Sequence, residues 1–195
     1  WVSNAEVNAR QANASGATLS GVRADEGATV NFLLGNASGA GVDGITCLKG
    51  SRVNARQANC NSCTGDGIYA TEQGQVVAVS ATAVGCGAHG VRAEFGSEII
   101  AYLLTATGCD IGAYAANGSH IFARQADFSG ATGAYGARCN VGATLNVRSA
   151  NCQQGGSPAS TDISLSLGGL IYASAATGGL SQTANTLTVN GIIFQ

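Results

Sequence analysis

The sequence contains no methionine and a single proline, Pro158, and only 10% of its 195 residues carry a charge. So few charges exclude the clustered Lys/Arg surface that nucleic-acid binding requires. The uninterrupted apolar runs are too short for a helix that crosses a bilayer, so we predict no membrane insertion. Because the chain begins without Met and without a charged segment followed by an apolar one, we expect a fragment of a longer protein that carries no signal peptide.

Cysteine is present in an odd number, seven residues, which argues against a closed disulfide framework in a chain of this length. Free thiols persist mainly in reducing compartments. We therefore expect the chain to fold in a reducing environment.

Glycine, at 29 residues, is abundant and recurs at a regular spacing. An incomplete unit precedes Gly21, and a looser unit begins at Asp162. Such self-similarity at a fixed period indicates a repeat architecture. Between the incomplete first unit and the looser last one, the units start 22 to 24 residues apart, at Gly21, Gly44, Gly67, Gly90, Gly112 and Gly136.

Each unit contains two short alternations of apolar residues, such as Val22 with Ala24 and Val30 with Phe32. This period of two predicts β-strands, and no window shows the sustained 3.6-residue period of a helix. Short strands separated by glycine turns in units of this length are typical of a parallel β-helix, whose equivalent positions stack roughly 4.8 Å apart. We predict an all-β fold, a right-handed parallel β-helix of about eight coils in a single solenoid, with residues 1–176 as its body.

The repeat dissolves after Tyr172, and the last residues follow a different pattern. Two β-rich runs flank Asn190 and Gly191, a dipeptide typical of tight hairpin turns. A solenoid needs its last coil covered, because an open strand edge promotes aggregation. We predict that residues 177–195 form a capping hairpin or an oligomerisation segment.

Three apolar side chains, Val77, Ile100 and Phe122, occupy one outward position in successive units, and Tyr102 lies beside them. A contiguous exposed apolar patch usually marks an interface. We predict that it joins copies of the chain in a symmetric homo-oligomer. The alternative is a one-residue error in the predicted register, which would exchange the inward and outward faces.

The residue just before the unit start is a carboxylate in two successive units, Asp43 and Asp66, and is His89 in the next unit. Two carboxylates on adjacent coils would be roughly 5 Å apart, as in a retaining glycosidase. Glu72, which forms a second and less aligned pair with Glu94, is a third candidate acid or base. The alternative, and the favoured role for Asp43 and Asp66, is that an Asp-Gly turn uses the side chain to bind its own backbone. We assign His89 to the same turn.

A second outward position holds Tyr69, Arg92 and Tyr114, and also Arg23 and Arg138. Guanidinium groups and aromatic rings in one row are suited to bind acidic sugars through charge and ring stacking. We predict Arg92, Tyr69 and Tyr114 as substrate-binding residues. The alternative is an ordinary solvated surface.

Cys63, Cys86 and Cys109 occupy the same position in three successive units. Inside a coil, a free thiol behaves as a small apolar group, which predicts a cysteine ladder without metal or cofactor. A zinc site that combines these residues with Cys60 is the alternative, but the usual second Cys-x-x-Cys pair is missing.

The end of the chain resembles a known family. A Gly-Gly turn at Gly178 and Gly179, followed by Asn-Thr-Leu-Thr-Val-Asn-Gly-Ile-Ile-Phe from Asn185 to Phe194, resembles the C-terminal end of bacteriophage tailspikes. The repeat body from Glu6 to Ala173 is similar in style, although β-helix coils are generic. The closing motif covers only about a tenth of the chain, and no catalytic motif can be matched residue by residue.

The resemblance implies a homotrimer of parallel coils that attaches to the phage tail through an N-terminal domain outside this sequence. It implies a virion protein that folds in the host cytoplasm and acts outside the cell, at the bacterial surface. It also implies binding, and commonly cleavage by hydrolysis or elimination, of lipopolysaccharide O-antigen or capsule.

Three other interpretations compete with a polysaccharide-cleaving spike. In the first, the segment is a non-catalytic trimerisation and stability module. In the second, it is a secreted pectate-lyase-like β-helix enzyme, which would need a calcium-binding carboxylate cluster that the sequence does not display. The third is a bacterial adhesin.

Overall fold

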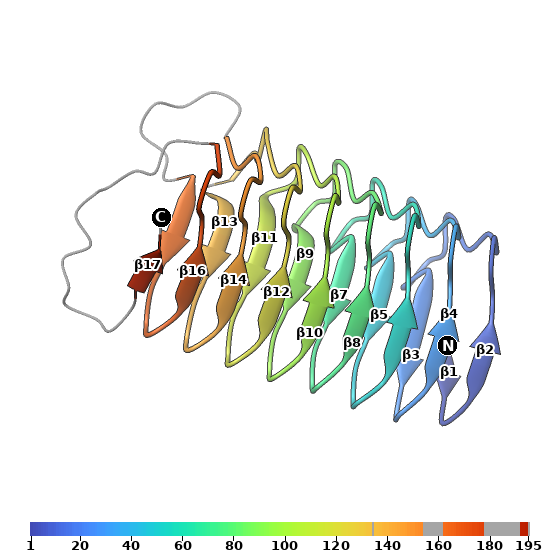
Figure 1. The fold of residues 1–195 in the computed structure, drawn as a ribbon. Helices are drawn as coiled ribbons and strands as arrows, with labels where there is room; N and C mark the ends of the chain where they lie inside the picture. The colour runs from blue at the N-terminus through green and yellow to red at the C-terminus, as the bar shows by residue number, and fades with distance from the viewer. Residues whose placement is uncertain (134, 154–161, 178–191, 195) are drawn as a thin grey trace.

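The computed structural model describes residues 1–133, 135–153, 162–177 and 192–194. They wind around a single axis as a right-handed parallel β-helix of about seven turns, against the eight predicted (Figure 1). The all-β fold class is confirmed. In the described part of the chain, no helix is long and apolar enough to cross a membrane.

Two sides of each coil are parallel β-sheets. Sheet A contains β1 (Val2–Ser3), β3 (Val22–Asp25), β5 (Ile45–Cys47), β7 (Ile68–Ala70), β9 (His89–Ala93), β11 (Ile111–Ala115), β13 (Tyr135–Cys139) and β15 (Ile163–Leu165). Sheet B contains β2 (Glu6–Asn8), β4 (Thr29–Asn31), β6 (Arg52–Asn54), β8 (Gln75–Val77), β10 (Glu98–Ile100), β12 (His120–Phe122), β14 (Thr144–Asn146), β16 (Leu170–Tyr172) and β17 (Ile192–Phe194).

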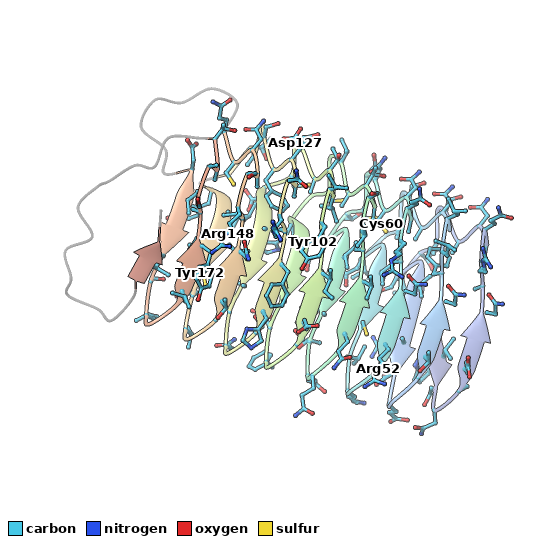
Figure 2. The ribbon with its side chains drawn as sticks, in the orientation of Figure 1. Arg52, Cys60, Tyr102, Asp127, Arg148 and Tyr172 are labelled. Carbon is cyan, nitrogen blue, oxygen red and sulfur yellow. The ribbon has the colours of Figure 1, made fainter. Side chains whose placement is uncertain are left out.

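The third side of the coil is a ladder of single parallel bridges rather than a sheet. Asn and Asp side chains on this ladder accept hydrogen bonds from the backbone two residues further along the chain. For example, Asp127 (labelled in Figure 2) accepts the backbone N–H of Ser129 at 3.0 Å. One residue per coil pairs with the next, namely Asn13, Asn36, Asn59, Thr82, Thr105, Asp127, Asn151 and Thr177.

The alternation of apolar and polar residues correctly predicts which side chains enter the core. In sheet B, Val76 lies opposite Ile99 and Ile99 opposite Ile121, and all three are at most 1% exposed. In sheet A, Ile68 and Val91 stack in the same way and are fully buried. The predicted register, and with it the assignment of inward and outward faces, is confirmed.

The glycine that begins each sheet A unit is required by a close approach between neighbouring strands. A Cβ on Gly67 would lie 2.4 Å from the Cβ of Ala83 and 2.7 Å from the carbonyl oxygen of Gly90. Gly90 has the same surroundings one coil later, with Ala106 and Gly112 as its neighbours. Any larger residue at these positions would push sheet A away from the third side of the coil.

The turn from sheet A to sheet B needs two successive residues with a positive φ, the left-handed backbone conformation. Lys49 and Gly50 both have a positive φ, at 49° and 69°. In the next coil Glu72 and Gln73 occupy these positions, with φ values of 50° and 67°. Gly74, the glycine nearest to this turn in the sequence, therefore lies just beyond the turn.

The predicted C-terminal hairpin around Asn190 and Gly191 lies outside the described residues, apart from β17. This strand pairs in parallel with β16, with Ile193 opposite Ile171, and extends sheet B by one strand. The cap and the boundary at residues 176 and 177 therefore stay predictions.

Replacing Gly67 by Ala should destabilise the coil by about 2 kcal/mol, because an added methyl group in a packed interior forces the backbone to move. The matched control is Gly118→Asn, at a positive φ of 71° with nothing within 4 Å of a Cβ, which should cost less than about 1 kcal/mol. Denaturant unfolding measures both. Equal effects of the two substitutions would contradict the close approach at Gly67.

Candidate functional site

The outward face of sheet A carries two neighbouring columns of polar and aromatic side chains. The first, here named the acidic column, contains Asp43, Asp66 and His89, each on the next coil. In the second, here named the Arg/Tyr column, parallel pairing places each residue directly opposite the next: Thr46, Tyr69, Arg92, Tyr114 and Arg138.

Asp66 and His89 form a hydrogen-bonded pair between adjacent coils. Oδ1 of Asp66 accepts the backbone N–H of His89 at 2.9 Å and lies 2.7 Å from Nδ1 of its ring. Asp66 is only 3% exposed, whereas the His89 side chain is 16% exposed. The carboxylate therefore fixes the orientation of the imidazole ring, and His89 has more than the turn role that the sequence suggested.

Asp43 binds the backbone of the next coil, and not that of its own turn, which was the role that the sequence favoured. Its Oδ1 accepts the backbone N–H of Asp66 at 2.9 Å, and its Oδ2 accepts the hydroxyl of Thr46 at 3.0 Å. Burial raises the pKa of Asp43 above its ordinary value, and the negative charge of Asp66 acts in the same direction. Both carboxylates thus stabilise the stacking of coils.

Glu72, the third predicted acid or base, is not brought together with the other two. It is exposed and lies in the turn that leaves sheet A, where the pKa of Lys49 is raised mainly by its hydrogen bond to Asp25 and to a smaller extent by the charge of Glu72. The assignment of Asp43, Asp66 and Glu72 as acid and base stays a prediction.

The predicted binding residues Tyr69, Arg92 and Tyr114 do lie together. The Arg92 guanidinium carbon is 4.8 Å from the centre of the Tyr69 ring and 6.0 Å from that of Tyr114. Tyr114 also stacks on His89, with ring centres 5.1 Å apart. The two columns therefore form one continuous surface.

Two carboxylates hold Arg92 in place. Its Nη2 donates to Glu94 at 2.7 Å, and its Nη1 lies 3.6 Å from Asp66. Burial alone would lower the pKa of Arg92, but the charges of Asp66 and Glu94 outweigh it and raise the pKa. The hydroxyl of Tyr69 donates to the same Glu94 oxygen at 3.1 Å.

Glu94 and Tyr135 are members of this surface that sequence reasoning did not assign to it. Glu94 lies two residues after Arg92, and residues two apart on a strand share a face, so the spacing contained this signal. Tyr135 lies opposite Ile111, which in turn lies opposite His89. The Tyr135 ring centre is 5.2 Å from the Arg138 guanidinium carbon.

A separate charged cluster occupies the N-terminal end of sheet A. Burial would raise the pKa of Asp25, but hydrogen bonds from Arg23 and Lys49 outweigh it and lower the pKa. A pocket of about 420 Å³ lies beside this cluster and is lined by Trp1, Leu19, Ser20, Arg23 and Val42. It lies several coils from His89 and Arg92 and does not belong to the surface they form.

The predicted interface residues form a strip on the outward face of sheet B. Val77 lies opposite Ile100, Ile100 lies opposite Phe122, and all three are partly exposed. Tyr102, labelled in Figure 2, is 36% exposed, and further along this side Arg148 lies 5.5 Å from the ring centre of Tyr172. The strip exists as predicted, and its role as an interface stays a prediction.

The cysteines line the interior of the coil, and all seven are free and buried. The Sγ of Cys86 donates to the carbonyl of Cys60 at 3.2 Å, and that of Cys109 donates to Ala83 at 3.0 Å. Burial raises the pKa of Cys47 to about 12. Within the described ranges, no three His, Cys, Asp or Glu side chains are grouped so that they would hold a metal ion.

Comparisons with known proteins do not assign the chain to a family. No protein-family model matches it, and no curated protein is significantly similar to it. The fold and the surface of sheet A are therefore the basis for a function.

Replacing Asp43 by Asn should reduce the loss of stability as the pH rises from about 4 to 7. The folded protein raises the pKa of Asp43, so the native state holds this proton more tightly than the unfolded chain does. The resulting stability is complete below the unfolded pKa and is lost as the pH rises through the folded pKa, whereas Asn does not ionise. Unfolding midpoints across this pH range measure the difference.

The control for this comparison is Glu72→Gln, which removes an exposed carboxylate and should follow the wild-type pH profile. A profile for Asp43→Asn that is parallel to wild type would contradict the raised pKa.

Proposed function

We propose that this chain is part of a bacteriophage tailspike and that the outward face of sheet A binds a bacterial surface polysaccharide. The observation that carries the proposal is the Arg/Tyr column, in which Tyr69, Arg92, Tyr114 and Arg138 succeed one another on consecutive coils. The resemblance of the segment from Asn185 to Phe194 to tailspike C-termini supports the choice of family.

A column of this kind matches a linear sugar polymer that lies along the coil axis. From Tyr69 to Arg138, each coil presents one aromatic or guanidinium group at roughly 4.8 Å intervals, so a polymer meets a new contact on each of these coils. Tyrosine rings offer apolar faces with a polar tip, and guanidinium groups donate several hydrogen bonds in one plane. A parallel β-helix provides the straight and rigid support that this requires.

The surface is also preorganised. Asp66 and Glu94 fix Arg92, and Asp66 fixes His89, before any ligand arrives. Groups that are already held lose less conformational entropy on binding, which favours affinity. Asp43 and Asp66 are buried and engaged by backbone donors, so binding accounts for the geometry better than cleavage at these two carboxylates does.

Sheet B supports the trimer that the tailspike proposal includes. Its strip of Val77, Ile100 and Phe122, with Tyr102 beside it, faces away from the core on three successive coils. Removal of such a strip from water would stabilise contacts between copies by roughly 25 cal/mol for each Å² of apolar surface. The two outward faces would then have separate roles, glycan binding on sheet A and assembly on sheet B.

Tyr114→Ala should weaken polysaccharide binding about fivefold, since an aromatic contact contributes about 1 kcal/mol. The measurement is retention on a panel of purified O-antigens and capsular polysaccharides, followed by calorimetry on the polymers that bind. Tyr114→Phe keeps the ring, and Arg124→Ala alters an exposed residue of the turn that follows β12, so both should retain binding. Absence of binding to every polymer, or equal binding by Tyr114→Ala, would refute the proposal.

Light scattering of the 19.3 kDa chain should give three times its mass, and Ile100→Asp should give the monomer mass because a charge would be buried in the seam. Phe95→Asp is the matched control: it also replaces an exposed apolar residue, but in a turn outside the strip, and should remain trimeric. A monomeric wild-type chain at all concentrations would contradict the assembly.

A further inference from the structure

We infer that Arg138 is the subsite for a carboxylate-bearing sugar, an inference that rests on the proposed glycan-binding function of sheet A. Three arginines occupy the same position of the Arg/Tyr column on different coils, namely Arg23, Arg92 and Arg138. They differ in the residue two positions later in the chain, and this difference determines which of them has charge available for a ligand.

Arg23 and Arg92 are each paired with the carboxylate two residues further on. Arg23 lies 3.2 Å from Asp25, and Arg92 lies 2.7 Å from Glu94. The residue two positions after Arg138 is Asn140, whose amide carries no charge. At this coil, therefore, the position two residues further on does not supply the counter-ion that it supplies to the other two arginines.

No carboxylate elsewhere in the described chain replaces the missing one. Among the described residues, no Asp or Glu oxygen lies within 4.0 Å of the Arg138 guanidinium. The amide oxygen of Asn140 is engaged by the hydroxyl of Ser166. Nε is buried and has no hydrogen-bond partner in both Arg92 and Arg138, so the missing carboxylate, and not Nε, is what distinguishes Arg138.

The rings around Arg138 favour a sugar over a simple anion. The guanidinium carbon lies 5.2 Å from the ring centre of Tyr135 and 5.8 Å from that of Tyr114. These contacts hold the planar group while its N–H edge can pair with two carboxylate oxygens at once. Tyrosine faces next to that edge offer apolar surface to the ring that carries the carboxylate.

The charge of the outward face of sheet A also changes, from negative on the earlier coils to positive at Arg138. The coils that contain Asp43, Asp66 and Glu94 supply three buried carboxylates, of which Asp66 and Glu94 pair with Arg92, and together they would repel an anionic sugar. In the column that holds Glu94, the next two coils carry Ala116 and Asn140, and neither is charged. A polymer with uronic acid units would therefore place a carboxylate at Arg138 and uncharged sugar faces at Tyr69 and Arg92.

The test uses a polysaccharide that the wild-type chain binds, before and after chemical reduction of its carboxyl groups to alcohols. Reduction should weaken binding at least tenfold. Asn140→Asp should weaken binding of the untreated polymer to a similar extent, because it restores the internal counter-ion that Arg92 has in Glu94. Arg138→Gln should do the same, and neither variant should alter binding of the reduced polymer.

The control is Gln125→Glu, which adds the same charge at an exposed position in the turn that follows β12, away from sheet A, and should bind like wild type. Asn140→Asp is nearly isosteric, and its unfolding midpoint should equal or exceed that of wild type, which separates a binding effect from misfolding.

Binding that is unchanged by carboxyl reduction, or by Asn140→Asp, would overturn the inference. Reduction leaves phosphate substituents intact, so a charge effect at Arg138 that survives reduction would identify phosphate and also overturn it. If the reduced polymer binds as tightly as the untreated one and Tyr114→Ala still weakens that binding, the glycan-binding function stands without the carboxylate subsite. If no polymer binds, both the carboxylate subsite and the glycan-binding function are refuted.

Discussion

The close stacking of one coil on the next is the constraint on which the rest of this structure depends. Every position of the repeat becomes a column parallel to the axis, because strands pair in register from coil to coil. Apolar columns are buried and form the core, and polar columns form the surface. Gly67 and Gly90 show how tight this stacking is, since neither position has room for a Cβ.

Much of the fold could be predicted from the sequence, because residues at equivalent positions of the repeat are those that share a column. The period of two separates Val76 and Ile99, which are buried, from Val77 and Ile100, which are partly exposed. The turn at Glu72 and Gln73 is harder to locate, because a positive φ does not require glycine and the nearest glycine, Gly74, follows the turn.

The site was less predictable, since its chemistry depends on pairs within and between columns. Tyr69, Arg92 and Tyr114 were found because they share one column. The pairing of Asp66 with the ring of His89 depends on side-chain orientation between coils, which a repeat alignment does not specify. Glu94 was recognised as a carboxylate, but its contact with Arg92 depends on two columns being adjacent on the same face.

The unequal lengths of the units have a consequence for how such a chain changes over evolutionary time. The unit from Gly90 to Gly112 is 22 residues long and the next is 24, yet Ile99, Ile121 and Leu145 remain directly opposite one another. An insertion or deletion between strands is therefore absorbed within its own coil, because the next strand pairs again in the original register. Loops can lengthen and bring new contacts to the rim while both faces of the solenoid keep their alignment.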